Sequence, residues 1–464
     1  MKPDTQPGEI SKSLRNMIWI LVLGALAPML DTTIVNVALP TIGHALHTSV
    51  SSSQWTITGY LLAMGIVIPL SGWLLDRLGG KRLWVGALLF FLVGSALSGA
   101  AWNITSLIVF RIIQGAAAGI IMPLMTTLGI RIGKGVPLGK LMAVATLPIV
   151  VVPVLGPIIG GLIVGSVNWR WIFYVNVPIC LLAAGLAWWK FPPDDTVAER
   201  HPFDLLGFAQ LAPAVALILY GLSQATGIHA FGERKAYLPI VAGLALTASF
   251  TAYAFRKDHP LINVRTLRVR AYAASLGILF FSGLAVYGPL LLVSLFYQEV
   301  QHKSVLMTGL LLTPQGVGSL LPRMLTGKLV DRTGPRPIIL GGLAITVLAT
   351  LPFAFATTHT NEWLLAVVLF FRGVGLTPVN IAVMVGAFQG VPKEELASAS
   401  STTRIVQQVG GSFGIAVLIV ILTRAMLTHA LPAEAFDVAF WWSIGFVALA
   451  VIPSLMLPKL KKAT

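Results

Sequence analysis

Long apolar segments recur along almost the whole chain and constrain its fold more than any other feature. A helix needs about 20 mostly apolar residues to cross a hydrocarbon core about 30 Å thick. Fourteen such segments occur, at 16–39, 54–75, 83–101, 105–130, 140–164, 171–190, 205–222, 236–255, 272–297, 305–327, 338–357, 363–387, 399–423 and 437–457. They predict an all-α polytopic membrane protein with fourteen transmembrane helices.

Composition and charge distribution agree with this prediction. Only 11% of residues are charged and 56% are hydrophobic, whereas soluble domains carry about 25% charged residues. With both termini in the cytoplasm, 23 of the 32 Lys and Arg residues fall in cytoplasmic segments and five in outer ones. This bias follows the positive-inside rule. The net charge of +15 is therefore a topology signal, and we expect no nucleic-acid partner.

Other classes of protein lack support in the sequence. A single cysteine, Cys180, leaves no internal disulfide and no cysteine-based metal site. The eight histidines show no metal-ligand spacing, and no phosphate-binding loop occurs. An intramembrane enzyme would need paired catalytic carboxylates, a Ser/His pair or a His/metal cluster, and none is seen. We expect neither enzymatic activity nor a metal or cofactor.

Two stretches of the chain align without a gap. GWLLDRLGGKRLWVG at 72–86 and GKLVDRTGPRPIILG at 327–341 share glycine, aspartate and arginine positions 255 residues apart. We therefore expect two related six-helix bundles with two helices inserted between them, and parallel repeats of this kind are typical of transporters. The expected division is 1–190, a linker with the inserted helices at 191–270, and 271–464.

The repeated G-x-x-x-D-R-x-G loop faces the cytoplasm in both halves, because an inserted helix pair preserves parity. Glycines permit a tight turn, and the aspartate can accept charge-assisted hydrogen bonds from arginines or from a helix N-terminus. We expect a latch that holds the halves together in one conformation; the alternative is a solvated charged turn. The latch residues are Gly72, Asp76, Arg77, Gly79, Asp331 and Arg332.

Two opposite charges lie inside apolar segments of the first half. At 1.5 Å per residue, Asp31 and Arg111 both lie about 12 Å below the outer boundary of their helices. Charges at this depth are costly and usually functional. Burial favours a protonated carboxyl group and a guanidinium favours an ionised one. A conformational change can therefore load or release a proton at Asp31. The alternative is a static ion pair that only fixes packing.

Polar and aromatic side chains near this depth are candidates for a substrate cavity. They are Thr33, Asn36, Tyr60, Gln114, Gln315 and Arg372. For Asn36 and Gln114 the alternative is a plain interhelical contact. The second half contains no clear mid-membrane acid, so we expect one proton-coupling site. Monovalent cations, neutral amphiphiles and anionic metabolites all remain open as substrates.

The fifth apolar segment is rich in glycine and proline. Proline removes a backbone donor and bends a helix, and G-x-x-x-G spacing lets another backbone approach closely. We expect a bent, tightly packed hinge helix, with generic membrane packing as the alternative. Its residues are Gly156, Pro157, Gly160 and Gly161.

With these motifs identified, the chain resembles the major facilitator superfamily and, within it, the 14-helix drug:proton antiporters. GWLLDRLGGKR resembles the superfamily's cytoplasmic loop, and LDTTIVNVALP resembles the first-helix motif of the 14-helix exporters. RIIQGAAAG is similar to the fourth-helix motif whose arginine, here Arg111, is implicated in proton coupling. LGPIIGG resembles the antiporter motif of the fifth helix, and NWRWIFYVNVP and FDLLG also look like this group. The resemblance covers essentially the whole length.

The resemblance implies a monomeric, proton-driven exporter of drugs or other amphiphilic small molecules in a bacterial inner membrane, working by alternating access. Within the transport class, the alternatives are a dedicated metabolite or organic-anion exporter and a proton symporter for a nutrient. The LGPIIGG motif favours export. A lipid-handling protein and a channel are disfavoured, the latter because a channel would not need two latch loops.

Overall fold

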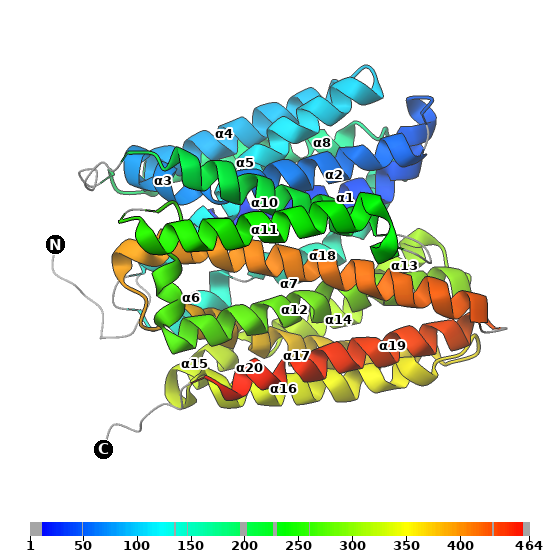
Figure 1. The fold of residues 1–464 in the computed structure, drawn as a ribbon. Helices are drawn as coiled ribbons and strands as arrows, with labels where there is room; N and C mark the ends of the chain where they lie inside the picture. The colour runs from blue at the N-terminus through cyan, green and yellow to red at the C-terminus, as the bar shows by residue number, and fades with distance from the viewer. Residues whose placement is uncertain are drawn as a thin grey trace. The chain divides into compact units, whose positions relative to one another are not determined.

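The computed structural model describes residues 12–48, 50–133, 136–145, 147–194, 202–225, 230–258, 260–428 and 431–457. These residues form helices and no strand (Figure 1). Eleven helices are long and apolar enough to cross a membrane, and a twelfth span is made if the bent pair α2–α3 is counted as one. The chain is therefore an all-α, multi-pass membrane protein, as predicted.

The chain divides into two compact units. The first comprises Met1–Ala216, Leu246–Val264 and Lys393–Arg404. Its helices are α1 (Lys12–Ala45), α2 (Val50–Val67), α3 (Leu70–Leu78), α4 (Gly80–Gly99), α5 (Ile104–Ile132), α6 (Leu138–Ala145), α7 (Leu147–Ser166), α8 (Trp171–Tyr174) and α9 (Asn176–Lys190), with parts of α10 (Leu205–Gln224), α11 (Arg234–Arg256) and α18 (Leu396–Thr428).

The second unit comprises Leu217–Ala245, Arg265–Pro392 and Ile405–Thr464. Besides the remaining parts of α10, α11 and α18, it contains α12 (Arg270–Leu295), α13 (Val305–Leu311), α14 (Thr313–Leu320), α15 (Arg323–Thr333), α16 (Pro335–Thr350), α17 (Glu362–Phe388), α19 (Pro432–Leu449) and α20 (Val451–Leu455). The three-part division at residues 190 and 270 follows the repeat rather than these units, and stays a prediction.

Several of the fourteen expected spans are interrupted helices. The span expected at 54–75 is α2 and α3, which meet at a 57° bend next to Pro69; proline removes the backbone N–H that would continue the helix. The span at 305–327 is divided between α13, α14 and α15. The span at 140–164 contains α6 and α7, and residue 146 between them lies outside the described residues. Because of the breaks at 54–75 and 305–327, and because spans are counted over the described residues alone, fewer continuous spans than apolar segments are found.

The internal repeat extends to backbone conformation. Gly79 follows α3 with φ 83° and ψ 164°, and Gly334 follows α15 with φ 83° and ψ 168°. This left-handed conformation suits glycine, which has no Cβ. A Cβ at Gly79 would also overlap the Asp194 carboxyl group. Both copies of the loop therefore turn the chain in the same way between two helices.

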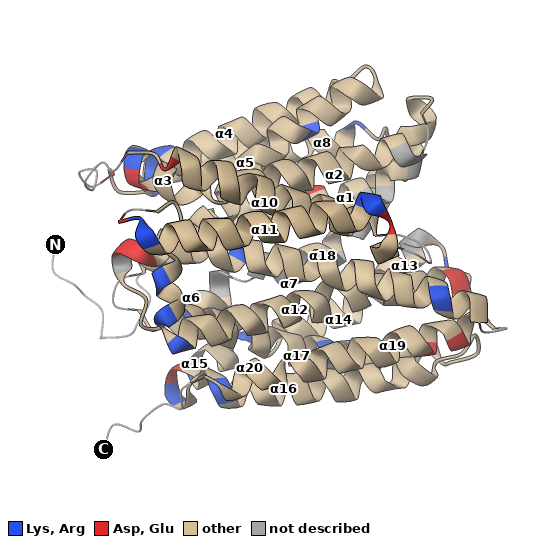
Figure 2. Ribbon diagram, viewed as in Figure 1, with Lys and Arg blue, Asp and Glu red and all other residues tan. Residues whose placement is uncertain are grey.

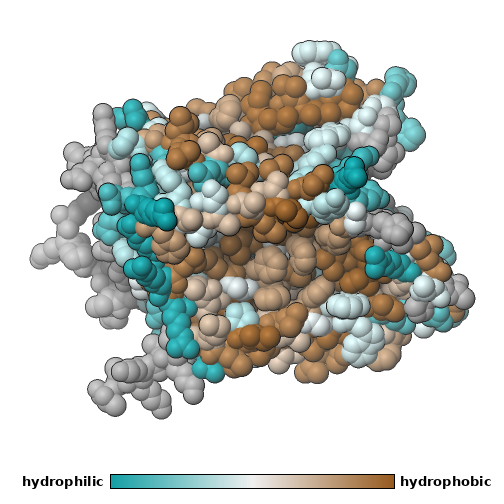
Figure 3. Space-filling view, in the orientation of Figure 1, coloured by the Kyte–Doolittle hydropathy of each residue, from teal (hydrophilic) through white to brown (hydrophobic). Residues whose placement is uncertain are grey.

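Charge and hydropathy follow the helices as a membrane environment requires. Charged residues lie mostly at helix ends (Figure 2), and hydrophobic side chains cover much of the face shown in Figure 3. Large apolar side chains such as Leu238, Val241 and Leu244 of α11 are exposed. Since lipid tails are as apolar as these side chains, the membrane accommodates them without a protein partner.

Candidate functional site

A buried ion pair forms the centre of the first unit. Asp31 of α1 and Arg111 of α5 are both fully inaccessible to solvent, and Arg111 Nη1 donates to Asp31 Oδ2. The structure thus contains the contact that equal depth in neighbouring helices predicted. An unpaired charge here would be strongly destabilising, so each partner depends on the other.

Two amides complete the surroundings of the Asp31 carboxylate. Gln114 Nε2 donates to Asp31 Oδ1 over 2.9 Å, and Asn176 Nδ2 of α9 donates to the same oxygen over 3.1 Å. Gln114 and Asn176 are also fully buried. With three donors and no water-facing atom, the ionised carboxylate is held entirely by protein groups.

The guanidinium of Arg111 is fixed from several sides. Its Nε donates to the Thr56 backbone oxygen over 3.1 Å, and its Nη1 to Gln114 Oε1 over 2.7 Å. The Tyr60 ring lies under it, with 4.1 Å between Arg111 Cζ and the ring centroid, and the Phe173 ring lies 5.6 Å away. Aromatic faces attract a desolvated cation. Arg111 therefore has little freedom to move without rearranging α2.

One hydrogen-bonding atom in this network has no partner. Asn176 Nδ2 also donates to Ser95 Oγ over 3.0 Å, and Ser95 Oγ donates to the Phe173 backbone oxygen over 2.8 Å. Asn176 Oδ1 is buried and accepts no hydrogen bond. A buried acceptor without a donor calls for an explanation, and it lies beside the carboxyl group that the sequence associates with protons.

Small residues allow the helices to approach closely enough for these contacts. A Cβ at Gly115 would overlap the Tyr60 backbone oxygen, and one at Gly94 would lie 2.9 Å from Gln114 Cα. Glycines at these two positions bring α2 and α4 against α5. The GAAAG run after Gln114 therefore has a packing role next to the ion pair.

The predicted cavity residues of the first half separate into two groups. Tyr60 and Gln114 contact Arg111, and the Tyr60 hydroxyl donates to the Pro28 backbone oxygen over 3.2 Å. Thr33 donates to the Leu30 backbone oxygen over 2.9 Å and faces Gly156 of α7. The Asn36 side chain lies outside the described residues.

Sequence reasoning missed Thr56, Ser95, Phe173 and Asn176, which all belong to the network. Thr56 contributes only a backbone oxygen, which no side-chain pattern reveals. Asn176 had a signal, because it is an amide inside the apolar stretch NWRWIFYVNVP at 168–178. Amides within transmembrane helices usually bond to a neighbouring helix.

In the second unit, Arg372 of α17 contacts Gln315 of α14. Arg372 is 1% exposed, its Nη1 donates to Gln315 Oε1 over 2.9 Å, and its Nη2 donates to the Ala285 backbone oxygen over 2.9 Å. Both residues were predicted to line a cavity, and the structure brings them together. Gln315 lies 255 residues after Tyr60, the same separation as the repeated loops. Tyr60 contacts Arg111 in the first unit.

The latch residues lie at helix ends. Arg131 of α5 donates to Asp76 Oδ1 over 3.2 Å, with both side chains partly exposed, and Arg77 lies over the Trp73 ring at 5.2 Å. A Cβ at Gly72 would lie 3.5 Å from Ala397 Cβ, so this glycine packs against the start of α18 within the first unit. Asp331 and Arg332 are exposed at the end of α15.

A different acid occupies the helix N-terminus beside this loop. Asp194, at the start of the expected linker, accepts from the backbone N–H groups of Lys81 and Arg82 over 2.7 and 3.2 Å. Carboxylates are favoured at helix N-termini by the helix dipole and the unpaired N–H groups. No motif in the sequence marks Asp194 as a capping residue.

Two of the four predicted hinge residues, Gly156 and Gly160, make close contacts with α1. A Cβ at Gly156 would overlap Thr33 Oγ1, and one at Gly160 would lie 3.3 Å from Ile34 Cγ2. Gly161 is partly exposed on α7, and the Pro157 side chain lies outside the described residues. The close approach of α1 and α7 places Asp31 on a tightly packed helix.

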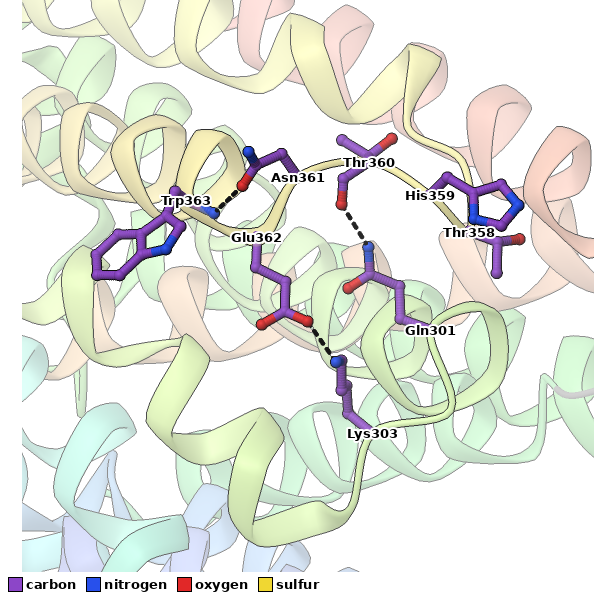
Figure 4. A pocket seen from close by; sticks show the side chains of 8 residues that line it. All are labelled: Gln301, Lys303, Thr358, His359, Thr360, Asn361, Glu362 and Trp363. Atoms are coloured by element: carbon purple, nitrogen blue, oxygen red, sulfur yellow. Dashed lines mark hydrogen bonds and ion pairs between the residues drawn. The ribbon is translucent and has the colours of Figure 1, made fainter.

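A polar cavity of about 420 Å³ lies at the N-terminal end of α17. Figure 4 shows Glu362 and Lys303 pointing toward one another across it, and their charged groups form an ion pair. Gln301 Nε2 donates to the Thr360 backbone oxygen over 3.2 Å. Glu362 is ten residues before Arg372, about 15 Å along the helix. This cavity is thus separate from the Arg372 contacts.

Comparison with known proteins identifies the family. Residues 21–415 match the model of the Major Facilitator Superfamily. The chain belongs to the major facilitator superfamily. The matched residues include the whole Asp31–Arg111 network and the Arg372–Gln315 contact. Members of this superfamily are transporters, so these buried charges lie in a transporter fold.

Relatives within the superfamily align over most of their length. The multidrug resistance protein B homolog of Mycobacterium tuberculosis is 34% identical over 456 residues, which cover 98% of this chain and 84% of that protein. The multidrug export protein EmrB of Haemophilus influenzae is 30% identical over 402 residues, covering 85% of this chain and 78% of that protein.

A solved structure supports the same fold. The structure of the proton:xylose symporter XylE aligns with a TM-score of 0.66 and 16% identity, covering 98% of each chain. At this identity the similarity concerns the fold alone. The predicted fold class is therefore confirmed: an all-helical major facilitator protein.

Proposed function

We propose that this superfamily member is a proton-coupled exporter of drugs or other amphiphilic small molecules. The observation that carries the proposal is the fully buried Asp31–Arg111 pair inside two membrane-spanning helices. A buried carboxylate whose contact with its counter-ion changes between conformations can take up and release one proton per cycle. The names of the multidrug relatives favour drug-like substrates and export over nutrient uptake.

The network suggests how a proton changes the site. Ionised Asp31 accepts hydrogen bonds from Arg111, Gln114 and Asn176. A protonated carboxyl group instead carries an O–H that needs an acceptor. Rotation of the Asn176 amide would turn its unpartnered Oδ1 toward Asp31 and satisfy that O–H. Protonation then weakens the attraction between Asp31 and Arg111, which loosens α1 from α5.

The transport cycle follows from this change. A proton enters Asp31 from the outside as substrate leaves there, and the proton leaves to the cytoplasm as the site resets. Asp76, Asp331 and the neighbouring latch residues hold the cytoplasmic side closed. The glycines of α7 seal the helix against α1. The proton gradient supplies the energy, without a cofactor, in a bacterial inner membrane, and a monomer with cytoplasmic termini is sufficient.

Proton movement in inside-out vesicles with an acidified interior tests the proposal. Adding an exported substrate should release protons from the vesicles, reported by a pH-sensitive dye, and Asp31→Asn should abolish this release. Asp258→Asn is a matched control because Asp258 is an exposed acid outside the membrane-spanning helices. Proton release by Asp31→Asn equal to wild type would reduce the ion pair to a structural role. A symporter would instead move protons and solute in the same direction.

A further inference from the structure

The guanidinium of Arg372 is a buried cation without a counter-ion. Among the described side chains no carboxylate forms an ion pair with it, whereas Arg111, Arg131 and Lys303 each pair with an acid. Its contacts are a neutral amide and a backbone oxygen, and its Nε is buried without a partner. Arg111 at the related position of the other half is neutralised by Asp31. The difference between the two arginines therefore needs an explanation.

The amide side chain that contacts Arg372 is partly accessible. Gln315 is partly exposed and lies two residues from exposed Val317, about 200° around α14. Asn380 of α17 is also partly exposed. It lies nine residues, or two and a half turns, from exposed Phe371 and therefore on the opposite face of the helix. Gln315 thus offers a partly exposed polar group in direct contact with the buried guanidinium.

The free donor of Arg372 has the geometry of a carboxylate site. Nε and Nη2 lie on one edge of the planar guanidinium, Nε–H has no acceptor, and Nη2 has one acceptor for its two hydrogens. Two parallel N–H groups on such an edge bind a carboxylate with two hydrogen bonds. Gln315 Oε1, an acceptor for Nη1, keeps the guanidinium oriented.

We propose that Arg372 and Gln315 bind the anionic group of the transported molecule, so that the substrates are amphiphilic organic anions. This inference rests on the proposed export function and gives it a substrate class. The substrate class also determines the net charge that crosses the membrane in each transport cycle. Export of a monoanion against one proton moves two charges per cycle, whereas a neutral substrate moves one and a monovalent cation none. Transport of the anion should therefore respond most strongly to membrane potential.

Three pyrene probes with one scaffold test the proposal: pyrenebutyrate, pyrenebutanol and pyrenebutyl-trimethylammonium. Binding to the purified full chain is followed by fluorescence anisotropy, and proton-coupled transport is followed in proteoliposomes with and without an imposed potential. We expect pyrenebutyrate to bind most tightly. Arg372→Gln should weaken its binding about 10- to 100-fold, the effect of losing a charge-assisted hydrogen bond, and Arg372→Lys should weaken it less.

The controls separate the proposed anion site at Arg372 from the proposed proton antiport. Arg234→Gln removes the same charge from an exposed site and should not change binding. If Arg372→Gln fails to fold, Arg372→Lys and Gln315→Leu should still lower pyrenebutyrate affinity selectively. Preferential binding of the ammonium probe, equal binding of all three, or binding of chloride but not pyrenebutyrate would overturn the substrate class. If no probe moves protons while pyrenebutyrate binding depends on Arg372, the proposed antiport fails and the anion site stands.

Discussion

At the scale of single residues, the central feature is the mutual dependence of Asp31 and Arg111. Both are fully buried, and the hydrogen-bond partners that they lack in lipid are supplied by Gln114, Asn176 and Thr56. A group of this kind is stable only when it is complete, because each polar atom left unpaired carries its own desolvation penalty.

Removing one charge should therefore cost more than removing both. Arg111→Gln leaves Asp31 buried without its cation and should lower the free energy of unfolding by about 3–5 kcal/mol. Asp31→Asn combined with Arg111→Gln should recover much of this loss, since no charge is left uncompensated. Denaturant unfolding of the purified variants measures both. Strictly additive losses would show that the two side chains are not energetically coupled.

At the scale of helices, contact between α1 and α7 depends on glycine. Thr33 Oγ1 occupies the space that a side chain at position 156 would need, and Ile34 is fully buried against the same helix. Thr33 is two residues from Asp31, so the packing of α7 controls where the carboxylate lies. Close approach of this kind supplies dispersion contacts that replace the hydrophobic effect, which is absent between helices in lipid.

A single methyl group should distinguish this contact from generic packing. Gly156→Ala should lower the free energy of unfolding by about 1–3 kcal/mol, the usual range for overpacking. Gly165→Ala is its control in the same helix, because a Cβ there meets no atom within 4 Å, and it should be neutral. Thermal unfolding of the two variants compares them. Equal stability would mean that α7 moves away from α1 at little cost.

At the scale of the whole molecule, the two copies of the cytoplasmic loop have nearly the same backbone conformation at Gly79 and Gly334. The two stretches that match in sequence, 255 residues apart, therefore also match in structure. The distribution of Lys and Arg predicts that both loops face the cytoplasm, and this orientation stays a prediction.

Cysteine labelling tests this orientation. The single natural cysteine, Cys180, is fully buried and should not react with a membrane-impermeant maleimide. Trp102→Cys and Trp363→Cys replace side chains that are 71% and 81% exposed and should react in intact cells. Arg332→Cys should react only after the membrane is permeabilised. Labelling of Arg332→Cys in intact cells would reverse the proposed topology.

The sequence was sufficient to predict the all-helical membrane fold, the repeated loop and the ion pair, because each depends on local or periodic properties. An apolar run must reach across a bilayer, a repeated loop is visible as identical letters, and two charges at equal depth have few other partners. It did not predict the bend between α2 and α3, or the division of 305–327 into three helices. Those breaks depend on proline and on packing against neighbours.

By itself, then, the sequence determined a polytopic helical membrane protein with related halves and a carboxylate–guanidinium pair in one of them. Only the tertiary structure decided which atoms surround those charges. Asn176 lies 145 residues from Asp31, and Asp194 lies more than 110 residues from the helix N-terminus that it caps. Only the structure shows that Arg372 has an amide and a carbonyl where Arg111 has a carboxylate. Contacts at such separations depend on how helices pack, and helix packing follows from side-chain shape that hydropathy does not encode.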